Sequence, residues 1–192
     1  MNKIKIAISG IGAVGGYYGG LLAARYKDSE EIDIYFISRG ENLKKIREND
    51  GIEVKNSFLT IKAKPTLATD NPAEIGPVDY LFCCTKSYDL EKNIAQLAPV
   101  IGSKTVIIPL QNGVDIAERI QPLLPNNEIW KGCVYINSRL VRPGRVEKFT
   151  IKDRMFFGSK QGNKIRQKEL QEILANARIL TTIPDDIDLE IW

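Results

Sequence analysis

The sequence predicts an α/β protein with a doubly wound, mostly parallel sheet and an added antiparallel part near the C-terminal third. Apolar runs with the length of buried strands alternate with helical patterns in the order βαβαβ. A glycine-rich turn joins the first strand directly to the first helix. From Ile129 onward, by contrast, strand patterns follow one another with only short turns between them.

The composition is that of an ordinary globular protein. The chain has 192 residues, of which 43% are hydrophobic and 27% charged, enough for one large domain or for one domain and a fragment. The net charge of +3 is too small to indicate nucleic acid binding, and no apolar stretch is long enough to cross a membrane. The N-terminus has no signal region. We therefore expect neither nucleic acid nor a membrane as a partner, and a cytoplasmic location.

The cysteine and histidine contents limit the kinds of metal site and catalytic residue that this chain can have. The three cysteines form no CxxC or Cys/His cluster, so no metal site is expected, and their odd number fits a reducing compartment. Cys83 and Cys84 are adjacent in an apolar run and should point to opposite faces of a strand. The chain has no histidine, so any acid–base step must use a lysine or a carboxylate. A lactate-type dehydrogenase with a catalytic histidine is thereby excluded.

The first twenty residues contain the stretch around which the rest of the chain is organised. A strand predicted from Lys3 to Ser9 is followed, without a gap, by Gly10, Ile11, Gly12, Ala13, Val14 and Gly15. A helical pattern continues from there, which completes the dinucleotide-binding fingerprint of a Rossmann-type sheet. Gly10 would permit the tight turn, Gly12 the approach of a pyrophosphate, and Gly15 close packing of the helix on the sheet. The alternative is a tight strand-to-helix turn without a ligand.

The end of the second predicted strand, at residues 32–37, indicates which dinucleotide is bound. NAD-binding domains usually carry an acidic residue here, which accepts a hydrogen bond from the ribose 2′-hydroxyl. This chain has Ser38 and Arg39 instead. A hydroxyl and a guanidinium would bind a 2′-phosphate, so the expected cofactor is NADP(H). An exposed loop arginine is the alternative, and Glu41 would repel a phosphate.

The remaining elements follow from apolar periodicity and turn signals. In the middle of the chain we predict a helix at 41–49, then a hairpin of strands 52–54 and 59–61 that turns at Asn56-Ser57, and then a loop at 65–77. A strand at 78–84 is followed by a helix that ends at 97. A strand at 105–109 is followed by a helix at 114–123. The C-terminal third predicts strands at 129–140, 145–151, 154–158 and 179–183, a helix at 163–177, and a new helix from 184–186 onward.

Two further polar residues follow predicted strands. Lys86 lies after the strand at 78–84 and Asn112 after the strand at 105–109. Ligands of doubly wound sheets bind beyond the carboxyl ends of the strands, so we expect both residues beside the glycine turn and Arg39. A lysine there would attract an anionic ligand, and an amide would orient a carboxamide or a ketone. The alternatives are a solvated lysine that opens a helix and an asparagine that adopts a left-handed turn before Gly113.

Six segments in a fixed order carry a family resemblance: GIGAVGG, SRG, CTKSYD, LQNGVD, VYINSRL and RPGRV. Together they resemble the ketopantoate reductases (2-dehydropantoate 2-reductases), over the whole chain. That family reduces 2-dehydropantoate to (R)-pantoate with NADPH in pantothenate and coenzyme A biosynthesis. The resemblance therefore implies an NADPH-dependent oxidoreductase with a small-molecule keto acid as substrate.

The resemblance also implies roles for individual residues. Gly10 to Gly15 would hold the pyrophosphate, and Arg39 would meet the 2′-phosphate of the adenosine. Lys86 would lie along the nicotinamide ribose side of the cleft. Asn112 would contact the nicotinamide half of the cofactor and the substrate, so that Lys86 and Asn112 are the implied substrate-binding residues. Ser138, at a position where the family often carries alanine, would be a neighbour of the cofactor.

The catalytic residue is expected outside this sequence. In the family a segment resembling D-x-x-x-x-x-W is followed almost at once by a lysine, which protonates the substrate ketone as hydride arrives, and then by an all-helical domain. Here the sequence ends at Trp192. We therefore expect residues 1–184 to form the NADP-binding domain and residues 185–192 to start the first helix of a missing C-terminal helical substrate domain. The fragment would bind NADP(H) but be inactive, and an exposed docking patch would favour a homodimer.

Two other functions remain open on the sequence alone. The same glycine fingerprint occurs in other NAD(P)-dependent 2-keto acid, opine and glycerol-3-phosphate-type dehydrogenases. A non-catalytic NADP-sensing domain would also bind the cofactor, without a lysine-bearing second domain. Turnover by the full-length protein and the residues that follow Trp192 would distinguish these alternatives.

Overall fold

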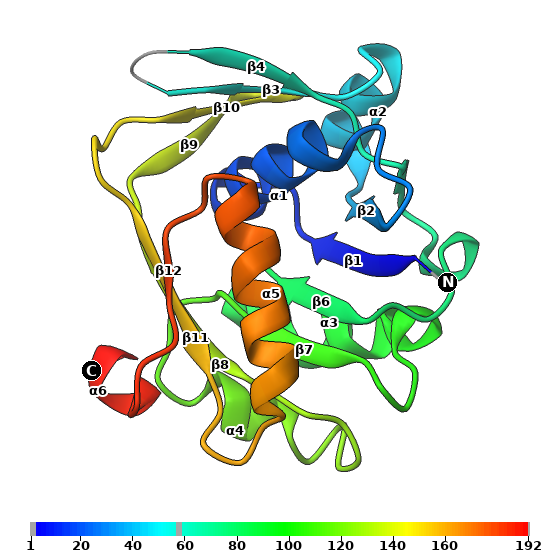
Figure 1. Cartoon of the computed structure of the whole chain (residues 1–192). Coiled ribbons are helices and arrows are strands. Elements are labelled where there is room, and N and C mark those ends of the chain that lie inside the picture. The colour runs from blue at the N-terminus through cyan, green and yellow to red at the C-terminus, as the bar shows by residue number, and fades with distance from the viewer. Residues whose placement is uncertain (1–2, 57–58, 192) are drawn as a thin grey trace.

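A five-stranded parallel sheet forms the centre of the molecule (Figure 1). The computed structural model describes residues 3–56 and 59–191 of the chain. The sheet has the order β5-β2-β1-β6-β7 and consists of β1 (Ile4–Ser9), β2 (Ile32–Ile37), β5 (Leu67–Thr69), β6 (Tyr80–Cys83) and β7 (Val106–Pro109). Strand order reverses between β1 and β6, which is where doubly wound sheets bind ligands. The predicted doubly wound fold is thereby confirmed.

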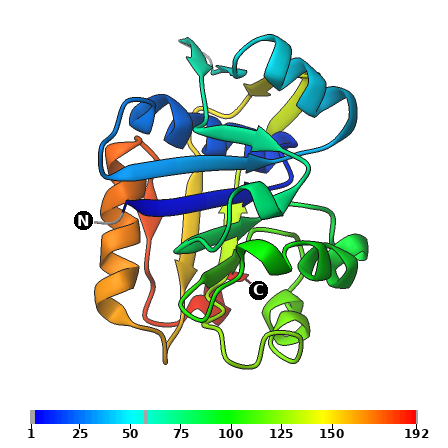
Figure 2. The ribbon, with the colours of Figure 1, turned by 90° about the vertical axis from the view of Figure 1, so that its right-hand side faces the viewer.

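Helices cover both faces of this sheet. Figure 2 shows α5 (Lys164–Asn176), in orange, and the green helices on opposite sides of the central strands. Core residues of α1 (Ala13–Tyr26) and α5 belong to one apolar cluster, and those of α3 (Leu90–Gln96) and α4 (Ile116–Ile120) to another. Ile6 and Ile8 of β1 point into the first cluster and Ala7 into the second. Because these strands are buried on both faces, their sequences are nearly continuous apolar runs.

Two smaller sheets form the added part. One has the order β4-β3-β10-β9 and consists of β3 (Ile52–Lys55), β4 (Thr60–Ala63), β9 (Ser138–Arg142) and β10 (Arg145–Lys148). The other has the order β12-β11-β8 and consists of β8 (Lys131–Tyr135), β11 (Arg154–Gly158) and β12 (Thr181–Thr182). The pairs β9–β10 and β8–β11 are antiparallel, as predicted for this third of the chain.

Short helices fill the connections. These are α2 (Gly40–Glu48), α6 (Ile187–Ile191) and the 3₁₀ turns η1 (Pro72–Glu74), η2 (Ser87–Asp89) and η3 (Ala98–Val100). The hairpin of β3 and β4 is present, with Ile52 opposite Ala63 and Lys55 opposite Thr60. Its predicted turn at Asn56-Ser57 lies partly outside the described residues, because Ser57 is not among them, and neither is Trp192.

Several predicted boundaries were wrong. The single strand predicted at 129–140 is two strands, β8 and β9, which belong to different sheets. The predicted loop at 65–77 contains β5, a three-residue edge strand that is too short to show a periodicity. The helix predicted at 114–123 is only the five residues of α4, and the strands at 145–151 and 179–183 shorten to β10 and β12.

The sheet that contains β3 and β10 lies directly across α1. A Cβ atom at Gly16 would come within 2.6 Å of a methyl group of Val146, and one at Gly20 within 2.2 Å of a methyl group of Val54. Both valines are buried. Helix α1 is therefore packed between the central sheet and the second sheet, and this fixes the position of its amino end.

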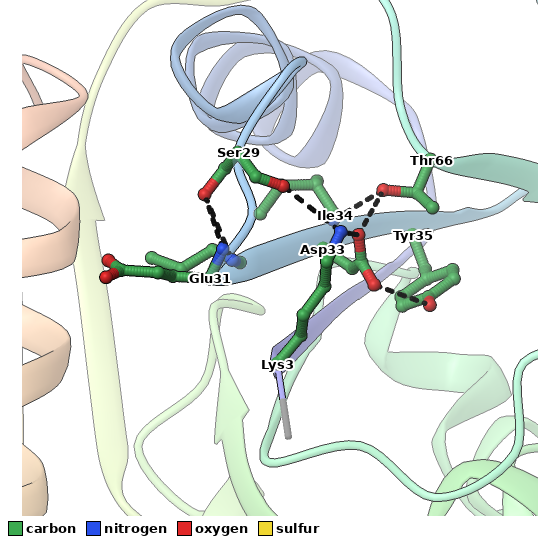
Figure 3. A network of polar contacts seen from close by, with 8 residues as sticks. Lys3, Ser29, Glu31, Asp33, Ile34, Tyr35 and Thr66 are labelled. Atoms are coloured by element: carbon green, nitrogen blue, oxygen red, sulfur yellow. Dashed lines mark hydrogen bonds and ion pairs between the residues drawn. The ribbon is translucent and has the colours of Figure 1, made fainter. Parts of the chain in front are cut away.

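The amino-terminal edge of the central sheet is held by a polar network around Asp33 (Figure 3). The Asp33 carboxylate accepts hydrogen bonds from Lys3 Nζ (3.1 Å), Thr66 Oγ1 (3.3 Å) and Tyr35 Oη (3.4 Å). Ser29 Oγ accepts from the Glu31 backbone amide at 3.1 Å. These contacts connect β1, β2 and the segment before β5 at the edge opposite to the glycine turn.

The cysteines are free thiols placed as the sequence predicts. Cys83 belongs to the apolar cluster on the α3 side, whereas Cys84 packs against the cluster on the α1 side. Burial raises the pKa of Cys83 to about 12 and also raises the pKa of Cys84. Because the thiolate is the reactive form, neither is poised as a nucleophile.

Candidate functional site

Four neighbouring strands of the central sheet end at one level. Their last residues lie in a single register row: Ile37, Ser9, Cys83 and Pro109. Backbone hydrogen bonds continue the row one step further, from Gly10 N to Ile37 O (3.0 Å) and from Leu110 N to Cys83 O (2.9 Å). The segments that carry the glycine turn, Arg39, Lys86 and Asn112 therefore leave the sheet side by side from its carboxyl edge.

Two of the fingerprint glycines are required by close packing. Gly10 has φ +92°, and a Cβ atom there would lie 2.8 Å from the backbone nitrogen of Thr85. A Cβ atom at Gly15 would lie 2.2 Å from the carbonyl oxygen of Gly10. These contacts agree with the roles expected for the first and third glycines, which are the tight turn and the close approach of helix and strand.

Gly12 differs from both, because no atom of the residues that the structure describes, apart from its chain neighbours, lies within 4 Å of its Cβ position. Helix α1 begins one residue later, with no side-chain cap and no acidic residue in its first turn. The first amides of a helix have no partner within it, and the helix dipole adds positive potential there. An uncapped helix end behind open space is the arrangement that binds a phosphate group.

The end of β2 carries no carboxylate that would accept from a ribose hydroxyl. Ser38 is buried, and Arg39 is exposed and extended where it precedes α2. Glu41 follows in the first turn of α2 and is also exposed. The hydroxyl and the guanidinium thus stand at the strand end next to the glycine turn, where the adenosine ribose of a dinucleotide lies in this fold class.

A chain of hydrogen bonds lies beneath the exposed Lys86 and Asn112. Gln111 Nε2 donates to Thr85 Oγ1 (3.1 Å), which donates to Asn93 Oδ1 (3.2 Å), and Asn93 Nδ2 donates to Ser9 Oγ (3.3 Å). These side chains join the ends of β1, β6 and β7 through α3. Neither Asn93 nor Gln111 could be predicted as part of the site, because their partners are distant in the chain and no sequence pattern marks them.

Ser138 reaches the site from the second sheet. Its hydroxyl donates to the carbonyl oxygen of Ala13 in the first turn of α1, at 3.1 Å. It is half-buried and lies at the start of β9. The structure therefore places Ser138 against the glycine turn, although it is 125 residues away in the sequence.

Neither a membrane-spanning helix nor a metal-binding cluster is found in the part of the chain that the structure describes. None of its helices combines the length and the apolar character that crossing a membrane requires. No group of three or more His, Cys, Asp and Glu side chains among the described residues is arranged to hold a metal ion.

Comparison with known proteins identifies the family of this chain. The sequence profile described as ketopantoate reductase PanE/ApbA matches residues 6–162. The chain belongs to the ketopantoate reductase family. This is a family of NAD(P)-dependent oxidoreductases. The family resemblance predicted from the six sequence segments is thereby confirmed.

Individual relatives agree with the family assignment. A crystal structure of 2-dehydropantoate 2-reductase from Porphyromonas gingivalis W83 is 43% identical, with a TM-score of 0.94, and its match covers 99% of this chain and 67% of that one. A 2-dehydropantoate 2-reductase from Mesorhizobium japonicum is 28% identical over 98% of this chain and 62% of its own length. An uncharacterized oxidoreductase, YkpB, from Bacillus subtilis is 25% identical over 98% of this chain and 60% of its own. The chain thus spans about three fifths of the length of these curated relatives.

The fold is shared beyond these enzymes. The ternary structure of a D-mandelate dehydrogenase with NADH and anilino(oxo)acetate matches 98% of this chain with a TM-score of 0.82, at 24% identity. At this identity the match is informative about the fold alone. The same fold is therefore found in a 2-dehydropantoate 2-reductase and in a D-mandelate dehydrogenase.

Proposed function

We propose that this chain is the cofactor-binding part of an NADPH-dependent 2-dehydropantoate 2-reductase. The observation that carries the proposal is the carboxyl edge of the central sheet, where the glycine turn, Arg39, Lys86 and Asn112 follow neighbouring strands. Family membership and the 43% identity to the Porphyromonas gingivalis reductase support the substrate. We further propose a role in pantothenate synthesis and a cytoplasmic location, with which the free thiols agree.

In this proposal the backbone of residues 10–15 holds the pyrophosphate. The open space at Gly12 and the uncapped end of α1 fit a phosphate group there. Arg39 would pair with the 2′-phosphate, and Ser138 would lie beside the cofactor because it contacts Ala13 in the same turn. NADPH, when bound, supplies the hydride, and the protein orients the reacting groups.

The substrate end of the site would be formed by Lys86 and Asn112. Both are exposed at the ends of adjacent strands, β6 and β7. The ammonium group of Lys86 would attract the carboxylate of a keto acid, and the amide of Asn112 can donate to a ketone oxygen or to a carboxamide. Thr85 and Gln111 directly precede Lys86 and Asn112 in the sequence. The hydrogen bond between Thr85 and Gln111 would keep the two segments together.

Selectivity between the two nicotinamide cofactors tests the role of Arg39. We expect the unaltered chain to bind NADPH more tightly than NADH. Arg39→Gln should weaken NADPH binding by about tenfold or more, because hydrogen bonds to a charged group are lost, and should leave NADH binding nearly unchanged. Titration calorimetry with both cofactors measures this. Arg154→Gln, which removes an exposed arginine at the start of β11, is the control. Equal affinities of the unaltered chain for the two cofactors would contradict the assignment.

We also propose that residues 1–184 form the cofactor-binding domain, that residues 185–192 start the helical substrate domain, and that the proton donor is a lysine outside these 192 residues. The support is that the curated relatives are longer than this chain. The chain alone should bind NADPH but oxidise it no faster than a blank when 2-dehydropantoate is added, because the alkoxide that forms lacks its acid. Spectrophotometric assay of NADPH measures this, and turnover above the blank would overturn the domain-only role.

A further inference from the structure

Asn42 connects three segments that are distant in the sequence. It lies in the first turn of α2, three residues after Arg39. Its Nδ2 atom donates to the carbonyl oxygen of Ile11 at 2.6 Å and reaches Ser38 Oγ at 3.4 Å. Its Oδ1 atom accepts from the backbone amide of Gly144 at 2.8 Å. One half-buried amide thus contacts the glycine turn, the end of β2 and the turn between β9 and β10.

The bond to Ile11 determines how the glycine turn presents its amides. The carbonyl group of Ile11 and the N–H group of Gly12 belong to the same peptide plane. In a trans peptide these two groups point in opposite directions, and the structure describes no cis peptide bond. Asn42 holds the carbonyl group on its own side, so the N–H group of Gly12 must point away from it. Glycine turns readily flip their peptide planes, and an external hydrogen bond removes that freedom.

The bond to Gly144 anchors Asn42 itself. The carbonyl oxygen of Gly144 accepts from the Glu53 amide at 2.8 Å, which joins this turn to β3. The second sheet, already packed on α1, therefore also holds the side chain that orients the glycine turn. The contact with Ser38 extends the same support to the segment that carries Arg39.

We propose that Asn42 is a positioning residue for the dinucleotide, which aims the Gly12 N–H group at the pyrophosphate by holding the Ile11 carbonyl group. This inference rests on the proposed function, because the pyrophosphate is the ligand of that site. It adds a residue that lies outside the glycine fingerprint and that needs no contact with the cofactor. Both NADH and NADPH carry the pyrophosphate, so Asn42 acts on both, whereas Arg39 acts on the 2′-phosphate alone.

Two substitutions separate the bonds of Asn42. Asn42→Asp keeps an acceptor for the Gly144 amide but places a carboxylate oxygen against the Ile11 carbonyl oxygen. Asn42→Ala removes both bonds. Each should weaken the binding of NADH and of NADPH by about tenfold, with the NADPH/NADH ratio nearly preserved in Asn42→Ala. Titration calorimetry gives the affinities and differential scanning calorimetry gives Tm. Asn49→Asp makes the same charge change at the other end of α2 and should leave both affinities unchanged.

Amide NMR of the free protein gives a measurement that does not depend on the ligand. The Gly12 amide resonance should shift in Asn42→Asp and Asn42→Ala and stay in place in Asn49→Asp. If both Asn42 variants keep the original affinities and the Gly12 resonance, or lose Tm alone, the inference is overturned and the proposed function stands. If the unaltered chain binds neither dinucleotide, the proposed function fails. Even then, a Gly12 amide resonance that stays in place in both Asn42 variants would refute the proposed orientation of the peptide plane.

Discussion

Gly12→Ala is expected to remove dinucleotide binding while leaving the fold intact. Apart from its chain neighbours, none of the described residues lies within 4 Å of the Cβ position of Gly12, so a methyl group there meets no other described side chain or backbone segment. It would instead occupy the space through which a pyrophosphate approaches the uncapped end of α1. We expect NADPH affinity to fall by about hundredfold, or about 2.8 kcal/mol. Titration calorimetry measures the affinity, and a thermal scan checks that Tm stays within about 4 °C, as a helix N-cap change of about 1 kcal/mol allows.

The control for this variant is Gly102→Ala, which also adds one methyl group. Gly102 precedes β7 at the opposite edge of the central sheet, and its Cβ position is 3.1 Å from Pro77 Cβ. Its substitution should leave NADPH affinity unchanged at a small cost in stability. If Gly12→Ala bound NADPH as tightly as the unaltered chain, the open space at Gly12 would not be the pyrophosphate site.

Gly15→Ala, three residues further along, is expected to destabilise the fold, whereas Gly12→Ala should leave the fold intact. The added methyl group would lie 2.2 Å from the carbonyl oxygen of Gly10 and 2.9 Å from Cys84 Cβ. Neither atom is the end of a flexible side chain, so the start of α1 must move away from the strand ends. We expect a loss of about 3 kcal/mol or more in the free energy of unfolding, which lowers Tm by about 6–12 °C.

Thermal and urea unfolding of Gly15→Ala measure this loss, with Gly12→Ala as the matched variant in the same turn. Any loss of NADPH binding by Gly15→Ala should follow the loss of structure. A Tm within about 2 °C of the unaltered chain would contradict the close approach of helix and strand at this residue. Opposite results for the two glycines would separate the ligand-facing position of the fingerprint from the packing position.

The sequence predicts the parts of the site that depend on local pattern. Parallel strands joined by helices place all their carboxyl ends at one edge, so finding Arg39, Lys86 and Asn112 after separate strands was enough to predict their common edge. The role of each of these side chains stays a prediction. The sequence could not predict that Ile136 and Asn137 separate two strands of different sheets, because one asparagine beside a β-branched isoleucine, with no Gly or Pro, is a weak break in a strand pattern.

The polar contacts behind the site were not predictable, for a different reason. Asn42 and Ile11 are 31 residues apart, and Asn93 and Ser9 are 84 residues apart. A single asparagine on a helix carries no sign of its distant partner, and its usual interpretation is a solvated or capping residue. Only the three-dimensional arrangement identifies such side chains as supports of the glycine turn.

The packing of α1 between two sheets has a consequence for how mutational data on this chain should be interpreted. Gly12, Gly16 and Gly20 follow one another at intervals of one helical turn, so they form a continuous stripe. Val146 and Val54 contact the stripe at Gly16 and Gly20. A deep substitution scan should therefore find all three positions intolerant, although a ligand would explain only the first. Intolerance at Gly16 and Gly20 would mean that the interface between α1 and the second sheet has no room for a larger side chain. Loss of activity on substitution there would therefore not indicate contact with the cofactor.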